Sequence, residues 1–446
     1  MIKKIYIAFM FAGSMLMSSC DNFLDVQPVG KVIPNSLEEY RALLTTAYSI
    51  SFTDRSVCDM RTGDIMVRND EYDQNNYSDI ERWLDTNLKP STTEFKWADY
   101  YSNIFYANSI ISKKEEITEG SKEDIDQLVG EAYLMRGYLH FILVNLYGEP
   151  YTKAGAVDSK AVPLKLNIDL EDIPSRNTVG ELYASILSDI QDARKLLNRE
   201  EWESIYKYRF STLSVDAFES RVYLYMGEWQ NAYDAAERIL KKKSALENYN
   251  STDFKLPNQF QSVEMITAYE SIYNSSALNA SQVTPTFYQL FDATNDLRIG
   301  KYFGSANTNG NYPIKKTDGK SEYKCTFRTG ELYLNSAEAA ARLNKLPEAR
   351  TRLLELMEKR YTPEGYAQKK TVVEGMSQTL LITEILAERA RELAFEGHRW
   401  FDLRRTTRPR IEKVFDGTTL VLEQDDPRYT LRIPQSAITS NPGLLN

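Results

Sequence analysis

The chain has 446 residues, of which 42% are hydrophobic and 26% are charged, and its formal net charge is −9. This composition is typical of a globular protein and not of a disordered one. The acidic balance argues against nucleic acid as a partner, because phosphate binding requires concentrated lysine and arginine. With three cysteines and two histidines the chain has no metal-binding Cys/His spacing, and we expect neither a metal nor a cofactor.

The first twenty residues have the pattern of an exported, lipid-anchored protein. Two lysines precede an apolar stretch over residues 5–17, and two serines and Cys20 follow. This order predicts a signal peptide over residues 1–19, and the apolar stretch is shorter than the roughly 20 residues of a transmembrane helix. A cysteine at the cleavage point resembles a bacterial lipobox, so we expect Cys20 to be lipidated. An ordinary signal peptide with an incidental cysteine is the alternative.

The mature chain begins with a predicted tether, and a helix follows it. Ser36 and Glu39 have the spacing of a capping box at the start of that helix. Further stretches have helical periodicity, and two stretches rich in Asp, Asn, Ser and Tyr lack it. We therefore predict a tether over 20–36, helical repeats over 37–54, 94–243 and 327–405, a variable lobe over 55–93 and 244–326, and a C-terminal segment over 406–446 that ends as a loop or edge strand.

Two of the helical segments align with each other as repeats. Residues 213–242 and 327–359 both place small residues in a first helix, and Ser220 aligns with Ala337. Small side chains permit two helices to cross closely, and the pattern resembles a tetratricopeptide repeat. Generic amphipathic hairpins are the alternative. The expected fold is mainly α, a tetratricopeptide-repeat-like superhelix with an inserted irregular ligand-binding lobe; single helices are expected over 94–114, 124–147, 178–197 and 382–403.

Residues 385–405 interleave opposite charges with aromatic side chains at helical spacing. We interpret them as ion pairs in a packed interface and not as a catalytic carboxylate pair. Cys58 and Cys325 carry no spacing signal. Buried free thiols are expected for both, and a disulfide between them is the alternative.

At this point the chain resembles the SusD/RagB family of outer-membrane nutrient-uptake lipoproteins of Gram-negative bacteria. The resemblance runs nearly from end to end and depends on several motifs in the right order. They lie at residues 20–28, 97–108, 131–150, 161–164, 176–189, 328–339, 388–405 and 433–442.

The resemblance implies a single SusD-like domain over residues 37–446 and a function in uptake. Family members capture oligosaccharide, or in some cases peptide, at the cell surface and cover the mouth of a SusC-like TonB-dependent transporter barrel. They bind and do not cleave, and this chain has no G-x-S-x-G or H-E-x-x-H motif. The implied location is the outer membrane, with a lipid anchor and facing the exterior. A lipid-anchored glycoside hydrolase and a periplasmic helical-repeat adaptor are the less favoured alternatives.

Ligand residues cannot be transferred from the family, because they lie in its variable parts. Sugar recognition requires flat aromatic faces and fixed polar side chains, so we expect the ligand where these cluster outside the helices. Trp97 and Trp400 fall in family helices and are expected in the core. The candidates form three groups: Arg68, Tyr72, Asn75, Tyr77 and Trp83; Tyr269, Tyr273, Asn274, Phe287 and Tyr288; and Tyr302, Asn307, Asn309, Asn311 and Tyr312. For any one of them, packing against the body is the alternative.

Overall fold

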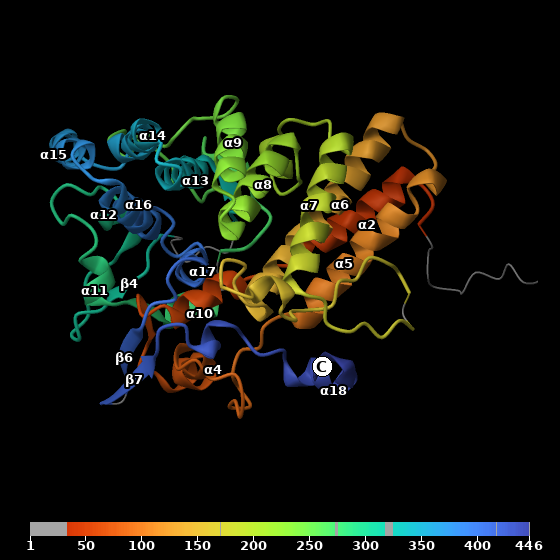
Figure 1. The fold of residues 1–446 in the computed structure, drawn as a ribbon, viewed down its shortest axis with the longest axis horizontal. Coiled ribbons are helices and arrows are strands. Elements are labelled where there is room, and N and C mark those ends of the chain that lie inside the picture. Colours follow the sequence, from red (N-terminus) through yellow and green to blue (C-terminus); the bar gives the residue numbers. More distant parts are fainter. Residues whose placement is uncertain (1–33, 170, 273–274, 317–323, 416, 446) are drawn as a thin grey trace, which may run out of the picture.

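The computed structural model describes residues 34–445 except 170, 273–274, 317–323 and 416. The predicted signal peptide, Cys20 and nearly all of the tether lie outside the described residues. Helices dominate what is described, as Figure 1 shows, and the mainly α prediction is confirmed. Among these residues, no helix is long and apolar enough to span a membrane.

The helical body is a row of packed helix pairs (Figure 1). Helix α6 packs on α7, α8 packs on α9, and α13 packs on both α9 and α14, which continues the row. This arrangement is consistent with the predicted repeat-like superhelix. The helices of the body are α2 (Leu37–Ser49), α5 (Trp97–Ser112), α6 (Lys122–Tyr147), α7 (Val179–Leu196), α8 (Thr212–Met226), α9 (Trp229–Leu240), α13 (Thr329–Arg342), α14 (Leu346–Glu358), α15 (Pro363–Glu374), α16 (Gln378–Glu392) and α17 (Arg399–Arg405).

The two predicted repeats are both helical hairpins. The turn between α8 and α9 contains Gly227 at φ 77°, and the turn between α13 and α14 contains Asn344 at φ 61°. Glycine and asparagine are the residues that most readily adopt this left-handed conformation after a helix. Within the first hairpin the Ser220 hydroxyl donates to the Ala232 carbonyl at 3.2 Å, a contact that a larger side chain would prevent.

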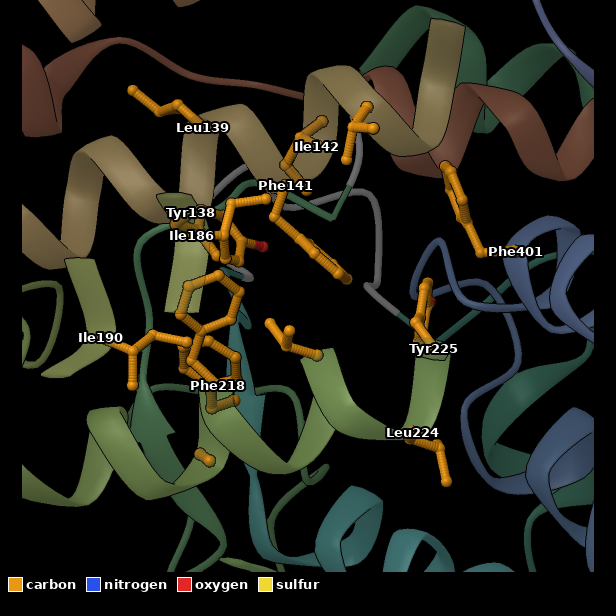
Figure 2. Packing of buried hydrophobic residues seen from close by; sticks show 14 of the residues in the cluster. Tyr138, Leu139, Phe141, Ile142, Ile186, Ile190, Phe218, Leu224, Tyr225 and Phe401 are labelled. Carbon is orange, nitrogen blue, oxygen red and sulfur yellow. The ribbon is translucent and has the colours of Figure 1, made fainter. Parts of the chain in front are cut away.

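Aromatic rings fill the interior between the helices, as Figure 2 shows. Tyr138 and Phe141 of α6 both meet Phe218 of α8 with ring centroids 5.4 Å apart and rings nearly perpendicular. Phe141 also lies 5.1 Å from Tyr225. Such edge-to-face pairs add to the stabilisation that burial of the rings provides.

The two stretches predicted as a variable lobe form one unit, which we call the lobe. A three-stranded antiparallel sheet of order β1-β3-β4 joins them, with Val67 opposite Ser281 and Val283 opposite Tyr312. The lobe also has a hydrophobic core of its own. Its elements are α3 (Asp54–Val57), β1 (Ile65–Val67), α4 (Glu71–Glu81), β2 (Met265–Thr267), α10 (Ser275–Ala280), β3 (Ser281–Val283), α11 (Pro285–Tyr288), α12 (Ile299–Tyr302) and β4 (Tyr312–Pro313), and β2 pairs with β5 (Phe327–Arg328) of the body.

The secondary structure differs from the prediction in three segments. The stretch 55–93 contains helix α4, whose first turn is capped by the Asp70 carboxylate. The helix expected over 382–403 is broken between α16 and α17, where Phe395 and Gly397 have positive φ. The C-terminal segment forms a hairpin of β6 (Ile411–Phe415) and β7 (Thr418–Leu422), followed by α18 (Gln435–Ser440). Short 3₁₀ turns complete the structure: η2 (Cys58–Arg61), η3 (Lys114–Glu116), η4 (Ala156–Asp158), η5 (Ser204–Tyr206), η6 (Pro427–Tyr429) and η7 (Pro442–Leu445).

A buried ionic cluster joins the lobe to the helical body. Glu392 of α16 accepts hydrogen bonds from Arg328 and Arg360 at 2.8 Å, and Glu396 lies 2.5 Å from the Lys316 ammonium. Burial opposes ionisation of Glu392, but Arg360 and Arg328 outweigh burial and hold its pKa well below the usual range. Five carboxylates and five cations make up the cluster: Glu264, Asp296, Glu388, Glu392, Glu396, Arg298, Lys316, Arg328, Arg360 and Arg391. The predicted ion-paired interface is confirmed.

Cys58 and Cys325 are both buried and unpaired, as expected. Burial raises the pKa of both thiols well above the usual range. A protonated, enclosed thiol is a poor nucleophile and acts as a small apolar side chain.

Candidate ligand-binding site

Trp83 is part of the core and not a ligand platform, which corrects the expectation for it. Its side chain is 1% exposed, and its indole N–H donates to the Arg61 carbonyl at 2.8 Å. The Lys413 ammonium lies 4.8 Å and the Arg428 guanidinium carbon 5.9 Å from the ring centroid. With its polar atom satisfied and its ring enclosed, Trp83 cannot stack on a sugar.

Two predicted tyrosines are likewise buried, in the core of the lobe. Tyr77 is 3% exposed and Tyr302 is fully buried. The Tyr302 hydroxyl lies 3.1 Å from that of Tyr249, and its ring lies 4.2 Å from the Lys316 ammonium. Both are therefore corrected from ligand contacts to structural residues. Tyr269, Phe287 and Asn311 are also buried and are corrected in the same way. Tyr273 and Asn274 lie outside the described residues.

The remaining candidates lie around the small sheet of the lobe. In an antiparallel sheet, paired residues point to the same side. The pairs Met66 with Gln282 and Gln282 with Pro313 therefore form a row across the three strands. Their neighbours on the strands, Val67 and Val283, are buried in the lobe core. The row consequently faces solvent, and sequence reasoning did not single out Gln282.

A pair of stacked tyrosines lies next to this sheet, where Tyr312 is paired with the buried Val283 and both rings pack against the lobe core. The rings of Tyr288 and Tyr312 are 3.9 Å apart and inclined by 3°, and both side chains are half-buried. Burial and the neighbouring Tyr312 hydroxyl raise the pKa of Tyr288, so its phenol is protonated at neutral pH. Beside the stack the Asn307 amide donates to the Gln282 side chain at 3.1 Å, and Asn309 is exposed.

The β1 edge of the sheet carries the first group of candidates. Arg68 follows β1, and its guanidinium is half-exposed and paired with Asp73 at 2.7 Å. Tyr72 in the first turn of α4 is 61% exposed, and Asn75 is exposed one turn further on. The Arg68 backbone N–H donates to the Ala280 carbonyl at 2.8 Å, which fixes this group to the sheet.

We call these exposed and half-exposed side chains the lobe edge. They supply an aromatic platform, amide donors and acceptors and one guanidinium, which is the combination that hydroxylated ligands require. The sequence identified the separate segments but not that they lie together in space. The sheet that unites them pairs β1 with β3, which are more than 200 residues apart in the sequence. The lobe edge comprises Arg68, Tyr72, Asn75, Gln282, Tyr288, Asn307, Asn309 and Tyr312.

A separate groove lies elsewhere, between α5, the segment that includes Pro163 and Pro174, and the C-terminal segment. Its volume is 910 Å³. Trp97, which was expected in the core, is only half-buried and lines this groove. The expectation for Trp400 is confirmed, because its side chain is 1% exposed.

No cluster of three or more His, Cys, Asp or Glu side chains in the described part of the chain is placed to hold a metal ion. The acidic residues at the start of α4 are used within the protein. Asp70 accepts from the Tyr72 backbone N–H at 3.1 Å, and Asp73 binds Arg68.

Comparison with known proteins places the chain in one family. A family model described as "Starch-binding associating with outer membrane" matches residues 22–224, and the model of the SusD family matches residues 185–446. Among curated proteins, SusD-like protein P38 of Formosa agariphila is 24% identical, over 91% of this chain and 92% of the relative.

Solved structures agree in fold. A SusD superfamily protein from Bacteroides thetaiotaomicron aligns with a TM-score of 0.78 at 24% identity, covering 92% of this chain and 99% of that one. A SusD-like carbohydrate binding protein from Bacteroides vulgatus aligns with a TM-score of 0.67 at 19% identity, covering 92% and 97%. The matched family model spans more than half of the chain, so this protein belongs to the SusD family.

Proposed function

We propose that this protein is a lipid-anchored outer-membrane protein that captures oligosaccharide at the cell surface and delivers it to a SusC-like TonB-dependent transporter. Membership of the SusD family supports glycan binding at the outer membrane. Cys20, in its lipobox-like context, supports the anchor. Stable anchoring by lipid needs more than one acyl chain, which the proposed modification of Cys20 provides.

The observation that carries the ligand class is the tyrosine stack at the lobe edge. The parallel rings of Tyr288 and Tyr312 form one apolar platform, and Asn307 and Asn309 provide amides next to it. Sugars combine apolar C–H faces with hydroxyl groups and therefore need both kinds of contact. The nearby Arg68 guanidinium adds a strong donor.

The proposal is tested by isothermal titration calorimetry of the purified full-length chain against neutral and acidic oligosaccharides. Tyr288→Ala and Tyr312→Ala each remove half of the stack, and we expect roughly a tenfold loss of affinity or more. The control is Tyr206→Ala, because Tyr206 is an exposed tyrosine in the turn η5, outside the lobe. Unchanged affinity in both lobe variants contradicts the assignment of the lobe edge.

Delivery to a transporter requires a stable complex in the membrane. We expect a large β-barrel protein to co-purify with this chain from native detergent extracts. Recovery of the chain alone under several mild detergents argues against a transporter partner. Access of external protease to the chain on intact cells separates a surface protein from a periplasmic adaptor, which the membrane would shield.

Two other functions remain to be separated by experiment. A peptide-capturing member of the family would bind peptides and no glycan in the same calorimetric panel. A glycoside hydrolase would release products from polysaccharide through two carboxyl groups. The carboxylates of the buried ionic cluster do not supply such a pair, because each is ion-paired and enclosed.

A further inference from the structure

The groove between α5 and α18 is built from three parts of the chain that are held together. The Tyr101 hydroxyl donates to the Pro163 carbonyl at 2.9 Å, and the Asn441 amide donates to the Pro174 carbonyl at 2.8 Å. Leu444 is 4% exposed and fixes the C-terminal segment to the body. A groove with fixed walls loses less conformational entropy when a ligand binds, and its volume of 910 Å³ is in the range of small-molecule sites.

The floor of the groove is a stripe of aromatic residues on α5. Trp97, Tyr101 and Phe105 follow each other at intervals of four residues, which is about 6 Å along the helix axis. The rings of Trp97 and Tyr101 are 5.1 Å apart and inclined by 46°. A helix normally turns such a stripe into the core, but these three side chains are half-buried and line the groove. This interval is close to that of successive rings in a linear oligosaccharide, and prolines of the facing walls narrow the space.

The charges around the groove select against an anionic ligand. Lys165 is paired with Asp172 at 2.8 Å, and Lys96 lies 3.8 Å from Asp99. The charges of both lysines are therefore partly neutralised, and the carboxylates of Glu94 and Asp169 also line the groove. Hydroxyl groups are good donors to carboxylates, whereas acidic sugars would be repelled. The charged residues of the groove are Glu94, Asp99, Asp169, Asp172, Lys96 and Lys165, four acids against two bases.

We propose that this groove is a second glycan-binding site, specific for neutral oligosaccharides and separate from the lobe edge. The ligand class rests on the proposed function of the protein. In the view of Figure 1, α18 beside the groove and α4 of the lobe both lie along the lower margin of the molecule. A long glycan that reaches both sites is held by both, and its affinity then exceeds that of either site alone.

The test is calorimetry of the full-length chain with neutral glucan, mannan, xylan and galactan oligosaccharides of increasing length. Phe105→Ala removes an aromatic contact, and Ser102→Trp fills the groove from an exposed position on α5 without removing any packing. We expect each change to weaken one of two binding events about tenfold and to abolish the gain in affinity with glycan length. Tyr206→Ala is the control, and Tyr288→Ala weakens the other event.

The possible outcomes separate this inference from the function on which it rests. If no oligosaccharide binds to the unaltered chain, the proposed function itself fails. If glycans bind in one event that neither Phe105→Ala nor Ser102→Trp changes, the groove is not a glycan site although the function stands. A groove that binds a proline-rich peptide in preference to every glycan also overturns the inference. Circular dichroism of each variant confirms that it is folded.

Discussion

A tryptophan binds sugar only through a ring face that solvent can reach, and Trp83 has none. The sequence placed it beside Tyr72 and Asn75 in a polar stretch, which made it the foremost ligand candidate. The stretch contains exposed polar side chains such as Asn75 and buried ones such as Asp79. Trp83 turns inward and hydrogen-bonds the Arg61 carbonyl. Composition reports the average of a segment, and burial is decided residue by residue.

Trp83→Ala is therefore expected to reduce stability and not to remove a ligand contact. Loss of a buried tryptophan leaves a cavity and costs about 3–5 kcal/mol of unfolding free energy. Chemical denaturation of the two proteins measures this difference. Tyr72→Ala, at a side chain that is 61% exposed, should change stability by less than about 0.5 kcal/mol. An unchanged unfolding free energy in Trp83→Ala would show that the Trp83 side chain is not buried in the folded protein.

Asp59 makes the stability of the protein depend on pH. Burial raises its pKa to about 7, with Asp64 adding to the effect and the Gly397 N–H and Arg55 opposing it. One of its carboxyl oxygens has no hydrogen-bond partner among the described residues. The unfolded chain has the ordinary value of 3.8, so folding takes up a proton between these two values. The contribution of Asp59 to stability therefore falls as pH rises across that window.

Asp59→Asn cannot ionise, so its stability relative to the unaltered protein should rise between about pH 4 and pH 7, by up to about 1.4 kcal/mol per pH unit. Urea unfolding of both proteins at several pH values measures this. A difference that does not change with pH means that the folded protein accommodates the charged carboxylate. A difference that falls with pH would contradict the sign of the shift.

At the scale of elements, the sequence predicted best where one face of a helix is apolar. Helices α6 and α7 were expected within two residues of their observed bounds for this reason. The break between α16 and α17 was missed because residues 382–403 keep their helical periodicity through it. Tertiary contacts impose the break, since Glu396 must reach Lys316 and Arg328 in the buried ionic cluster.

The break between α16 and α17 depends on Gly397. Comparing alanine substitutions at Gly397 and Gly155 separates the cost of a positive φ from the cost of a steric clash. Gly397 has φ 68° and Gly155 has φ 78°, so alanine is strained at both by about 1 kcal/mol. A Cβ on Gly397 would lie 2.8 Å from backbone atoms of Arg55 and Ser56, whereas one on Gly155 meets nothing within 4 Å. Gly397→Ala should therefore lower the unfolding free energy by about 1–3 kcal/mol more than Gly155→Ala does, which is the usual cost of overpacking. Equal losses in the two variants would exclude the clash.

At the scale of the whole molecule, helical periodicity was enough to predict a repeat-like body, because each repeat is stabilised by its neighbours along the chain. The lobe edge could be predicted only as separate segments. The stack of Tyr288 on Tyr312 depends on the pairing of β3 with β4, and the position of Arg68 depends on the pairing of β1 with β3. Strands of two or three residues carry almost no sequence signal, so this tertiary pairing was not predictable. The groove was missed because an aromatic stripe on a helix usually marks the core.

The predicted lipid anchor concerns the whole protein and stays a prediction. Cys20→Ser should prevent acylation, because the acyl chains are attached through the cysteine at the cleavage point. Mass spectrometry of the purified proteins should find acyl chains on the unaltered protein and none on the variant. Cys58→Ala is the control, since Cys58 is enclosed and its substitution should not affect acylation. An unaltered protein that carries no acyl chain at Cys20 would contradict the lipobox interpretation.

The buried ionic cluster has a consequence for exchanging binding specificity between members of the family. Arg298 and Lys316 belong to the lobe, whereas Glu388, Glu392 and Glu396 belong to the segment that starts with α16. A whole-lobe transplant that lacks these two cations would leave the three enclosed carboxylates with only Arg328, Arg360 and Arg391 as cationic partners in the described part of the chain. Removing cations from a buried ionic cluster is destabilising. Two surface segments contribute nothing to the cluster: residues 69–76, which include the start of α4, and residues 304–312. These segments are suitable places to graft a new binding specificity, because they can be replaced without changing any residue of the buried ionic cluster.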